Sequence, residues 1–385
     1  MLTANAHAQA KSAVESTRPV RHVAFHGRHA VQFLISFLLV FLAVDQFLAL
    51  QPLRELYGSR NYSLWKWKLL SSQSEGPDVV VLGSSYEAYG INPQVMDAAI
   101  RQALNVERTT LNLSASASSL LTQYLFVSRM LDAGHQPDVV LLGITPNAVD
   151  TGLASWLRNG LGALGAMDAV PLVFRHEPRF LDTAIPAALL KSYPRWHDFR
   201  ICVQRLMLAA PINPRSGEIR HANGWAEWRG DTNPGHETLD DSVDVISGHD
   251  VVMQERMASS NINGVAVRRS IRMLREAGVE VLLIELPHSR FAPAYASPSK
   301  NRPYAEFVEQ LRRETSVVVV RPPDGLLTDD DYWDGVHLSA EGAAKYSQWM
   351  ASHVVRSIQR RESSEQLAVW KDEKGSSEEE LVAVP

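Results

Sequence analysis

Short, uninterrupted apolar runs recur along the chain from residue 77 to residue 360, and stretches with helical spacing separate them. A strand that is apolar at every position is covered on both faces, which is typical of a parallel sheet between two helix layers. The pattern therefore predicts an α/β fold, a three-layer α/β/α sandwich. The expected strands lie at 78–82, 108–113, 138–143, 279–285 and 316–320, and the expected helices lie at 117–133, 258–277, 303–314 and 340–359.

Two segments depart from this alternation. About residues 150–257 mix apolar stretches with Pro, Gly and Asp clusters, which predicts a large insertion between the third and fourth strands. Residues 361–385 are acidic and serine-rich with few apolar positions, a composition typical of disorder. Residues 77–360 are therefore expected to form one domain with an insertion, followed by a disordered acidic tail.

A longer apolar run, VQFLISFLLVFLAVDQFLAL, covers residues 31–50. About twenty helical residues span the roughly 30 Å apolar core of a bilayer, so the run predicts one transmembrane helix, with a buried core helix as the alternative. It is longer than the apolar part of a signal peptide and no small-residue cleavage site follows it, so we expect a retained anchor. Residues 51–76, rich in Arg, Lys, Trp and Tyr, are expected to form a connector with a short interfacial helix.

Basic residues before the apolar run set its expected orientation. The tail of residues 1–30 carries a single acidic residue, Glu15, and more basic ones, namely Lys11, Arg18, Arg21 and Arg28. By the positive-inside rule, this tail stays in the cytoplasm. The chain is then expected to cross the cytoplasmic membrane once, with the domain of residues 77–360 on its outer side.

Composition and charge exclude several classes of partner. A net charge of −5 gives no long-range attraction for nucleic acid. The single cysteine, Cys202, cannot form an intramolecular disulfide and has no second thiol for a metal site. The Asp- and His-containing stretch at 236–250 has neither EF-hand nor zinc-helix spacing, so no metal or cofactor is expected. No strand is followed by a glycine-rich phosphate-binding motif, which argues against a nucleotide-binding domain.

Two short motifs carry the candidate chemistry. Gly83-Ser84-Ser85 ends the first expected strand, and a hydroxyl there lies at the carboxyl edge of a parallel sheet, where open α/β folds bind ligands. Asp334 and His337 are three residues apart before the last helix, so the carboxylate can bond to Nδ1 and leave Nε2 to face a serine. Serine becomes nucleophilic when such an imidazole accepts its proton. The motifs predict a Ser-His-Asp system, although each alone also fits a helix cap.

In these motifs and their order, residues 78–358 resemble the SGNH (GDSL-like) hydrolase superfamily. That family shares short conserved motifs called blocks. Gly83-Ser84-Ser85 stands where block I has Gly-Asp-Ser, and Asp334-x-x-His337 matches the Asp-x-x-His of block V. The resemblance implies a flavodoxin-like parallel sheet, with Ser85 as nucleophile and its own amide as one oxyanion donor.

Two weaker matches complete the oxyanion hole that the resemblance implies. In NLSASASS, Ser114 stands at the glycine of block II, and its backbone N–H would be a donor. In LGITPNAVD, Asn147 stands near the asparagine of block III, and its side-chain amide would be another.

The departures from the usual blocks, together with the apolar N-terminal run, are similar to the membrane-tethered branch of the superfamily. That branch includes proteins similar to the extracytoplasmic partners in teichoic-acid D-alanylation and in alginate or cellulose O-acetylation. The resemblance implies acyl transfer, with acetyl as the expected group, to or from a cell-surface polysaccharide beside a membrane-bound O-acyltransferase. Water as acceptor gives an esterase and a sugar hydroxyl gives an acyltransferase, and both remain open. The altered blocks II and III also fit a non-catalytic accessory or scaffolding subunit.

Three further residues are candidates for substrate binding. Trp333 adjoins Asp334 and offers a flat surface for a sugar ring. His288 and Arg290 follow the fourth expected strand and fall at the same sheet edge as Ser85. Arg290 would pair with a carboxylate or phosphate, unless this segment is a solvated loop. In the insertion, Trp225 and Trp228 fit packing better than sugar binding.

Overall fold

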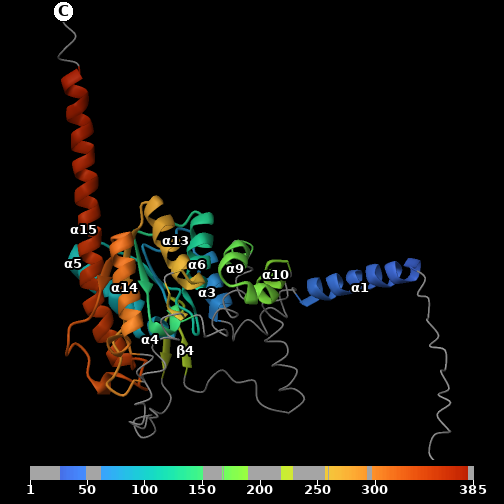
Figure 1. The fold of residues 1–385 in the computed structure, drawn as a ribbon. Coiled ribbons are helices and arrows are strands. Elements are labelled where there is room, and N and C mark those ends of the chain that lie inside the picture. The colour runs from blue at the N-terminus through green and yellow to red at the C-terminus, as the bar shows by residue number, and fades with distance from the viewer. Residues whose placement is uncertain are drawn as a thin grey trace, which may run out of the picture. The chain divides into compact units, whose positions relative to one another are not determined.

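The computed structural model describes residues 27–48, 62–150, 167, 169–189, 218–228, 256–258, 260–292 and 297–379. Its central sheet has five parallel strands in the order β2-β1-β3-β6-β7 (Figure 1). Each strand lies inside one of the apolar runs, so the prediction of a parallel sheet is confirmed. The strands are β1 (Val79–Leu82), β2 (Thr110–Asn112), β3 (Val139–Gly143), β6 (Glu280–Ile284) and β7 (Val318–Val320).

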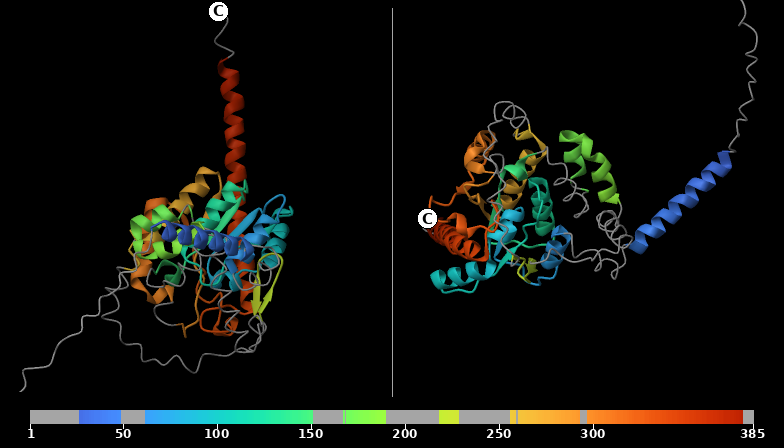
Figure 2. Two further views of the ribbon diagram at one scale, coloured as in Figure 1. Left: turned by 90° about the vertical axis from the view of Figure 1, so that its right-hand side faces the viewer. Right: turned by 90° about the horizontal axis from the view of Figure 1, so that it is seen from below.

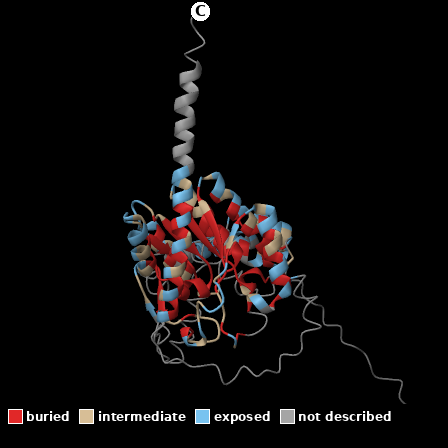
Figure 3. Cartoon of the chain, turned by 90° about the vertical axis from the view of Figure 1, so that its left-hand side faces the viewer, coloured by how far each residue is buried: buried red, intermediate tan, exposed pale blue. Residues whose placement is uncertain are grey.

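Helices cover both faces of this sheet, because neighbouring strand residues point to opposite sides. Val79 and Val81 of β1 join the core under α5 and α15, whereas Val80 and Leu82 join the core under α6, α13 and α14 (Figure 2). Most strand residues are buried and the outer faces of the helices are exposed, as Figure 3 shows, whereas Val318 of the edge strand β7 is 40% exposed. The expected three-layer sandwich is therefore present. Its helices are α5 (Pro93–Leu104), α6 (Leu120–Asp132), α13 (Ile262–Glu276), α14 (Arg302–Thr315) and α15 (Ala340–Glu379).

Asparagine side chains begin three of these helices. Asn92 Oδ1 accepts from Gln94 N at the start of α5, and Asn261 and Asn301 cap α13 and α14 in the same way. Such caps satisfy amides that have no partner inside the helix. The three caps therefore fix where α5, α13 and α14 begin.

The stretch between β3 and α13 contains local structure of its own. It includes α7 (Pro146–Val149), α9 (Val170–His176), the 3₁₀ turn η1 (Pro178–Phe180), α10 (Leu181–Leu189) and an antiparallel hairpin, β4 (Glu218–Arg220) with β5 (Ala226–Trp228). Trp225 of the hairpin is buried, and its Nε1 donates to the Tyr89 carbonyl at 3.1 Å. Trp225 therefore packs the hairpin onto the domain. The remainder of the expected insertion lies outside the described residues.

Part of the expected connector belongs to the domain. Helix α3 (Tyr62–Ser71) places Leu70 in the core, and the Lys66 side chain is fully buried. Lys66 Nζ donates to the carbonyl of Asn112 at 2.7 Å and to that of Gly224. A buried ammonium needs such acceptors, so Lys66 ties α3 to β2 and to the hairpin.

The N-terminal apolar run is helical over α1 (Gly27–Leu48), and its side chains from 31 to 43 are exposed. Within the described ranges, no helix combines the length and the apolar character needed to cross a membrane. The leader up to residue 26 and residues 49–50 lie outside those ranges.

Helix α15 continues to Glu379, so the prediction of a disordered tail at 361–385 is wrong for most of that segment. Overall composition suggested disorder, but the segment is rich in Glu, Gln, Lys, Leu and Ala, which all favour helix and can extend one that is already nucleated. Residues 380–385 lie outside the described residues.

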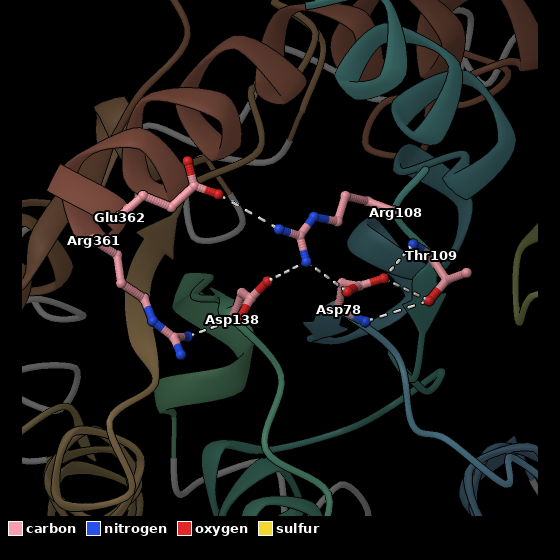
Figure 4. A network of polar contacts seen from close by, with 6 residues as sticks. All are labelled: Asp78, Arg108, Thr109, Asp138, Arg361 and Glu362. Carbon is pink, nitrogen blue, oxygen red and sulfur yellow. Dashed lines mark hydrogen bonds and ion pairs between the residues drawn. The ribbon is translucent and has the colours of Figure 1, made fainter. Parts of the chain in front are cut away.

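An ionic network holds the amino-terminal edge of the sheet together (Figure 4). Arg108 Nη1 lies 2.9 Å from Asp78 Oδ1 and 2.8 Å from Asp138 Oδ2, so it joins the segments before β1 and β3. From α15, Arg361 reaches Asp138 at 2.9 Å and Glu362 lies 3.6 Å from Arg108. Burial opposes ionisation of Asp78, but hydrogen bonds from Thr109 and Arg108 lower its pKa. The network fixes the end of the sheet opposite the candidate site.

Replacing Arg108 by alanine is expected to lower the free energy of unfolding by roughly 1–2 kcal/mol, because two charge-assisted hydrogen bonds are lost in a partly exposed place. The matched control is Arg101→Ala, whose ion pair with Glu107 is largely exposed, at 56% and 77% of the two side chains. That variant should change stability by less than about 0.5 kcal/mol. Urea unfolding of the full-length chain measures both values, and equal effects would contradict this role for Arg108.

Candidate active site

Ser85 lies directly beyond the carboxyl end of β1, where the strand order reverses between β1 and β3. Open α/β sheets place their ligands at such a switch point. Ser84 caps the short helix α4 (Ser85–Gly90), which begins with Ser85. From residue 79 to residue 93, Ser85 is the one position that is not buried. The strand and the cap together present this hydroxyl at the surface of the domain.

Asp334 and His337 lie in a tight loop before α15. Asp334 Oδ1 accepts from the backbone N–H of Val336 at 2.7 Å and from that of His337 at 2.6 Å. An antiparallel bridge between Tyr332 and Leu338 closes the loop. The short polar side chain thus folds the segment around itself, as aspartate does in turns.

The three predicted residues meet across the top of the sheet. His337 Nε2 lies 2.8 Å from Ser85 Oγ, and His337 Nδ1 lies 2.7 Å from Asp334 Oδ2. Burial opposes ionisation of Asp334, but the hydrogen bond and attraction from His337, with backbone donors, lower its pKa. An ionised Asp334 accepts a hydrogen bond from the Nδ1–H of His337, which leaves Nε2 unprotonated and able to take the proton of Ser85. The arrangement can therefore generate a serine nucleophile.

Aromatic rings enclose the imidazole of His337. Trp333 stacks on it with ring centres 5.1 Å apart and an 11° interplanar angle, and Tyr86 stacks at 5.4 Å and 25°. Tyr89 contacts it edge-on at 5.4 Å. These rings hold the imidazole in the plane that joins Ser85 to Asp334, and aromatic faces attract the positive charge that His337 gains during proton transfer. Trp333 therefore lines the site next to His337.

The two oxyanion candidates have hydrogen-bond partners within the protein. The Ser114 N–H donates to Asn112 Oδ1 at 3.0 Å, and Ser114 is fully buried. Asn147 Nδ2 donates to the Tyr86 hydroxyl at 3.0 Å, which places Asn147 beside the residue that follows the nucleophile. An amide –NH₂ has a second proton, whereas a backbone N–H has one. Asn147 therefore keeps a donor for a substrate oxygen, whereas the one N–H of Ser114 already donates a hydrogen bond to Asn112 Oδ1.

His288 lies beside Tyr86, with ring centres 4.8 Å apart. Its ring nitrogens are buried and make no well-formed hydrogen bond to any described residue. Burial lowers the pKa of His288 to about 3, and repulsion from His337 adds to this, while weaker interactions with the Leu286 backbone and Asp334 oppose it. His288 is thus a neutral ring at the edge of the site.

Arg290 extends from the same loop as His288, and it is largely exposed. Its Nε lies 2.8 Å from Asp329 Oδ2, and its backbone N–H donates to Asp329 Oδ1 at 3.1 Å. The loop also contacts the triad loop, because Ser289 Oγ donates to the Gly335 carbonyl at 2.9 Å. A substrate anion would have to compete with Asp329 for the Arg290 side chain.

Sequence reasoning missed the side chains that support the triad. Tyr86 and Tyr89 follow Ser85 at one and four residues, and their spacing does not distinguish a ring that packs on a catalytic imidazole from one that fills the core. Glu87 is fully buried beneath the nucleophile. Its signal was present, since Ser84-x-x-Glu87 has the spacing of a capping box, in which the acidic side chain reaches back to the first residue.

The parallel sheet and its hydrogen-bonded Ser-His-Asp set define a site of the serine-hydrolase type. No protein-family model and no curated protein matches the chain. Among solved structures, the chain is similar to one described as the crystal structure of TesA, with 10% sequence identity and a TM-score of 0.32. That comparison covers 72% of this chain and 98% of the other.

Proposed function

We propose that the chain is a serine esterase or acyltransferase that forms an acyl-serine on Ser85. The observation that carries the proposal is the continuous chain of hydrogen bonds from Ser85 Oγ through His337 to Asp334, at 2.8 and 2.7 Å. Both distances are within the range that proton transfer requires. The experiment that tests it is reaction of the full-length chain with a fluorophosphonate, which captures activated serines.

The proposed reaction has two halves. Ser85 Oγ attacks the ester carbonyl while His337 Nε2 takes its proton, and the developing oxyanion is held by the Asn147 side-chain amide and the Ser85 N–H. His337 then returns the proton to the departing alcohol, which leaves the acyl group on Ser85. In the second half, water or a sugar hydroxyl loses its proton to His337 and attacks the acyl carbonyl. The bond between the acyl group and Ser85 Oγ then breaks, and His337 returns the proton to Ser85 Oγ, which frees Ser85.

For the substrate, we propose an O-acetylated cell-surface polysaccharide and a membrane-bound O-acyltransferase as neighbour. The support is the resemblance of blocks I and V together with the aromatic surface that Trp333 adds to the site. For the location, we propose an anchor at 31–50 with the domain outside the cytoplasmic membrane. Its support is the exposure of large apolar side chains along α1, such as Phe33 at 70% and Leu34 at 65%. Membrane fractionation with alkaline carbonate extraction tests the anchor.

Asn147→Ala is expected to lower kcat for an activated acetyl ester by about 10²-fold and to leave KM nearly unchanged, because an oxyanion donor acts in the transition state. Steady-state kinetics measure the effect. The control Gln94→Ala removes an exposed amide on α5 and should be neutral. A rise in KM with kcat unchanged would assign Asn147 to substrate binding instead.

A non-catalytic accessory subunit is the second candidate, and the Ser114 geometry favours it. With the Ser114 N–H donated to Asn112 Oδ1, the oxyanion hole has one donor fewer than the family pattern implies. Such a subunit would keep the fold and neither react with a fluorophosphonate nor hydrolyse an acetyl ester. Assaying both reactions on one preparation separates the two candidates.

A further inference from the structure

Glu87 is a fully buried carboxyl group for which the reaction above has no use. Its Oε2 accepts from the Ser84 N–H at 2.6 Å and from Ser84 Oγ at 3.1 Å. Ser84 immediately precedes the nucleophile, and it lies in the short connection between β1 and α4. Glu87 therefore accepts hydrogen bonds from both the backbone N–H and the hydroxyl of Ser84, the residue that comes directly before Ser85.

Two glycines make the space in which this carboxyl group lies. A Cβ added to Gly83, at the end of β1, would lie 2.3 Å from Glu87 Oε2. A Cβ added to Gly143, at the end of β3, would lie 2.3 Å from Glu87 Cδ. Any larger residue at either strand end would collide with the carboxyl group. The slot at the switch point is thus shaped for Glu87.

These contacts fix the backbone on both sides of Ser85. The Ser84 hydroxyl donates a hydrogen bond to Glu87 Oε2 and accepts one from the Tyr86 N–H at 3.4 Å. The amides before and after Ser85 are therefore engaged, whereas the Ser85 N–H is the first amide of α4 and has no acceptor inside that helix. Ser85 Oγ remains in line with His337.

We propose that Glu87 is a positioning residue that acts as a carboxylate, holding Ser84 so that Ser85 meets His337. The inference rests on the proposed function, because it concerns the same nucleophile. A carboxylate is required because a charged oxygen accepts two donors at once more strongly than a neutral one. A neutral carboxylic acid or amide would place an O–H or an –NH₂ donor at the position of Oε1, which has no hydrogen-bond partner among the described residues.

The surroundings let Glu87 change its charge near neutral pH. Burial raises its pKa to about 7, and hydrogen bonds from Ser84 and its own backbone limit the rise. The titratable groups that interact with it from neighbouring elements are Tyr346 on α15 and Tyr304 on α14, and both of these tyrosines also interact with Glu285 beyond β6. Burial keeps both tyrosines neutral by raising each pKa, and no described cation contributes to the pKa of Glu87.

The test is the pH dependence of phosphonylation in the full-length chain. In that reaction Ser85 Oγ bonds to phosphorus, fluoride leaves and the serine proton passes to His337. The rate requires a neutral His337 and an ionised Glu87, so its logarithm should approach a slope of two against pH on the acidic side. Glu87→Gln should reduce that slope to one and lower the rate at pH 8 roughly tenfold.

The matched control is Glu285→Gln, which neutralises another buried carboxyl group near the same sheet edge, bonded to Tyr304 at 2.8 Å. Its slope should stay at two. A slope of two in Glu87→Gln, a slope of one in the unmodified chain, or failure of Glu87→Gln to fold at pH 8 would each overturn the inference. An unmodified chain that does not react at all would refute the proposed function instead.

Discussion

Replacing Ser85 by alanine is expected to lower kcat for 4-nitrophenyl acetate by about 10⁶-fold, because the group that carries the acyl chain is removed. Ser85 Oγ is the hydroxyl that lies 2.8 Å from His337 Nε2, and Ser85 is the one position between 79 and 93 that is not buried. Release of 4-nitrophenolate by the full-length chain measures the effect. The fold should be unchanged, since Ser85 lies at the first position of α4 and its hydroxyl caps nothing.

The neighbouring serine provides the control for this prediction. Ser84→Ala removes the hydroxyl that bonds to Glu87 and leaves Ser85 in place. Its kcat should fall no more than about tenfold, as expected for a small misplacement of the nucleophile. If Ser84→Ala were the more damaging change, Ser84 and not Ser85 would be the nucleophile.

Replacing Glu87 by glutamine is expected to stabilise the chain at pH 8 by about 3 kcal/mol. Burial raises the pKa of Glu87 from 4.5 to about 7 on folding. A raised pKa means that the stability present below pH 4.5 is lost as the pH rises through 7, where the folded chain must ionise a buried carboxyl group. Glutamine resembles the protonated form and escapes this loss. Urea unfolding of both proteins at several pH values gives the difference.

The advantage of glutamine should vanish at about pH 4, where Glu87 is protonated in both the folded and unfolded chains. A difference that does not change between pH 4 and pH 8 would show that Glu87 is not titrating in the folded protein. Together with the expected loss of nucleophile reactivity, a more stable Glu87→Gln would show that a destabilising charge is retained beneath Ser85 for its chemistry.

Residue pattern was sufficient for the sheet because the central strands β1 and β3 have no polar residue, although β2 contains Thr110 and Asn112 and β6 begins with Glu280. Runs such as Val79–Leu82 and Val139–Gly143 have no polar side, which identifies strands buried on both faces. Composition was a poorer guide to the segment after residue 360, because helix α15 is already nucleated on the sheet and extends to Glu379. Lys66 could not be predicted to lie inside the domain, since its acceptors are two backbone carbonyls distant in sequence.

At the site, the two motifs predicted the three residues that a serine nucleophile needs. The structure brings these residues, Ser85, Asp334 and His337, together. It did not predict how neighbouring amides are used. The Ser114 N–H is taken by Asn112 Oδ1, a contact between residues two apart that depends on a local turn. Tyr86 contacts His337 and Asn147 only because three separate segments meet at one edge of the sheet.

The central claim, that Ser85 is an activated nucleophile, is tested most directly by intact-mass analysis of the full-length chain after reaction with a fluorophosphonate. We predict one phosphonyl group per chain, located on the peptide that contains Ser85, and none on Ser85→Ala or His337→Ala. An unmodified chain, or a label on any residue other than Ser85, would contradict the account.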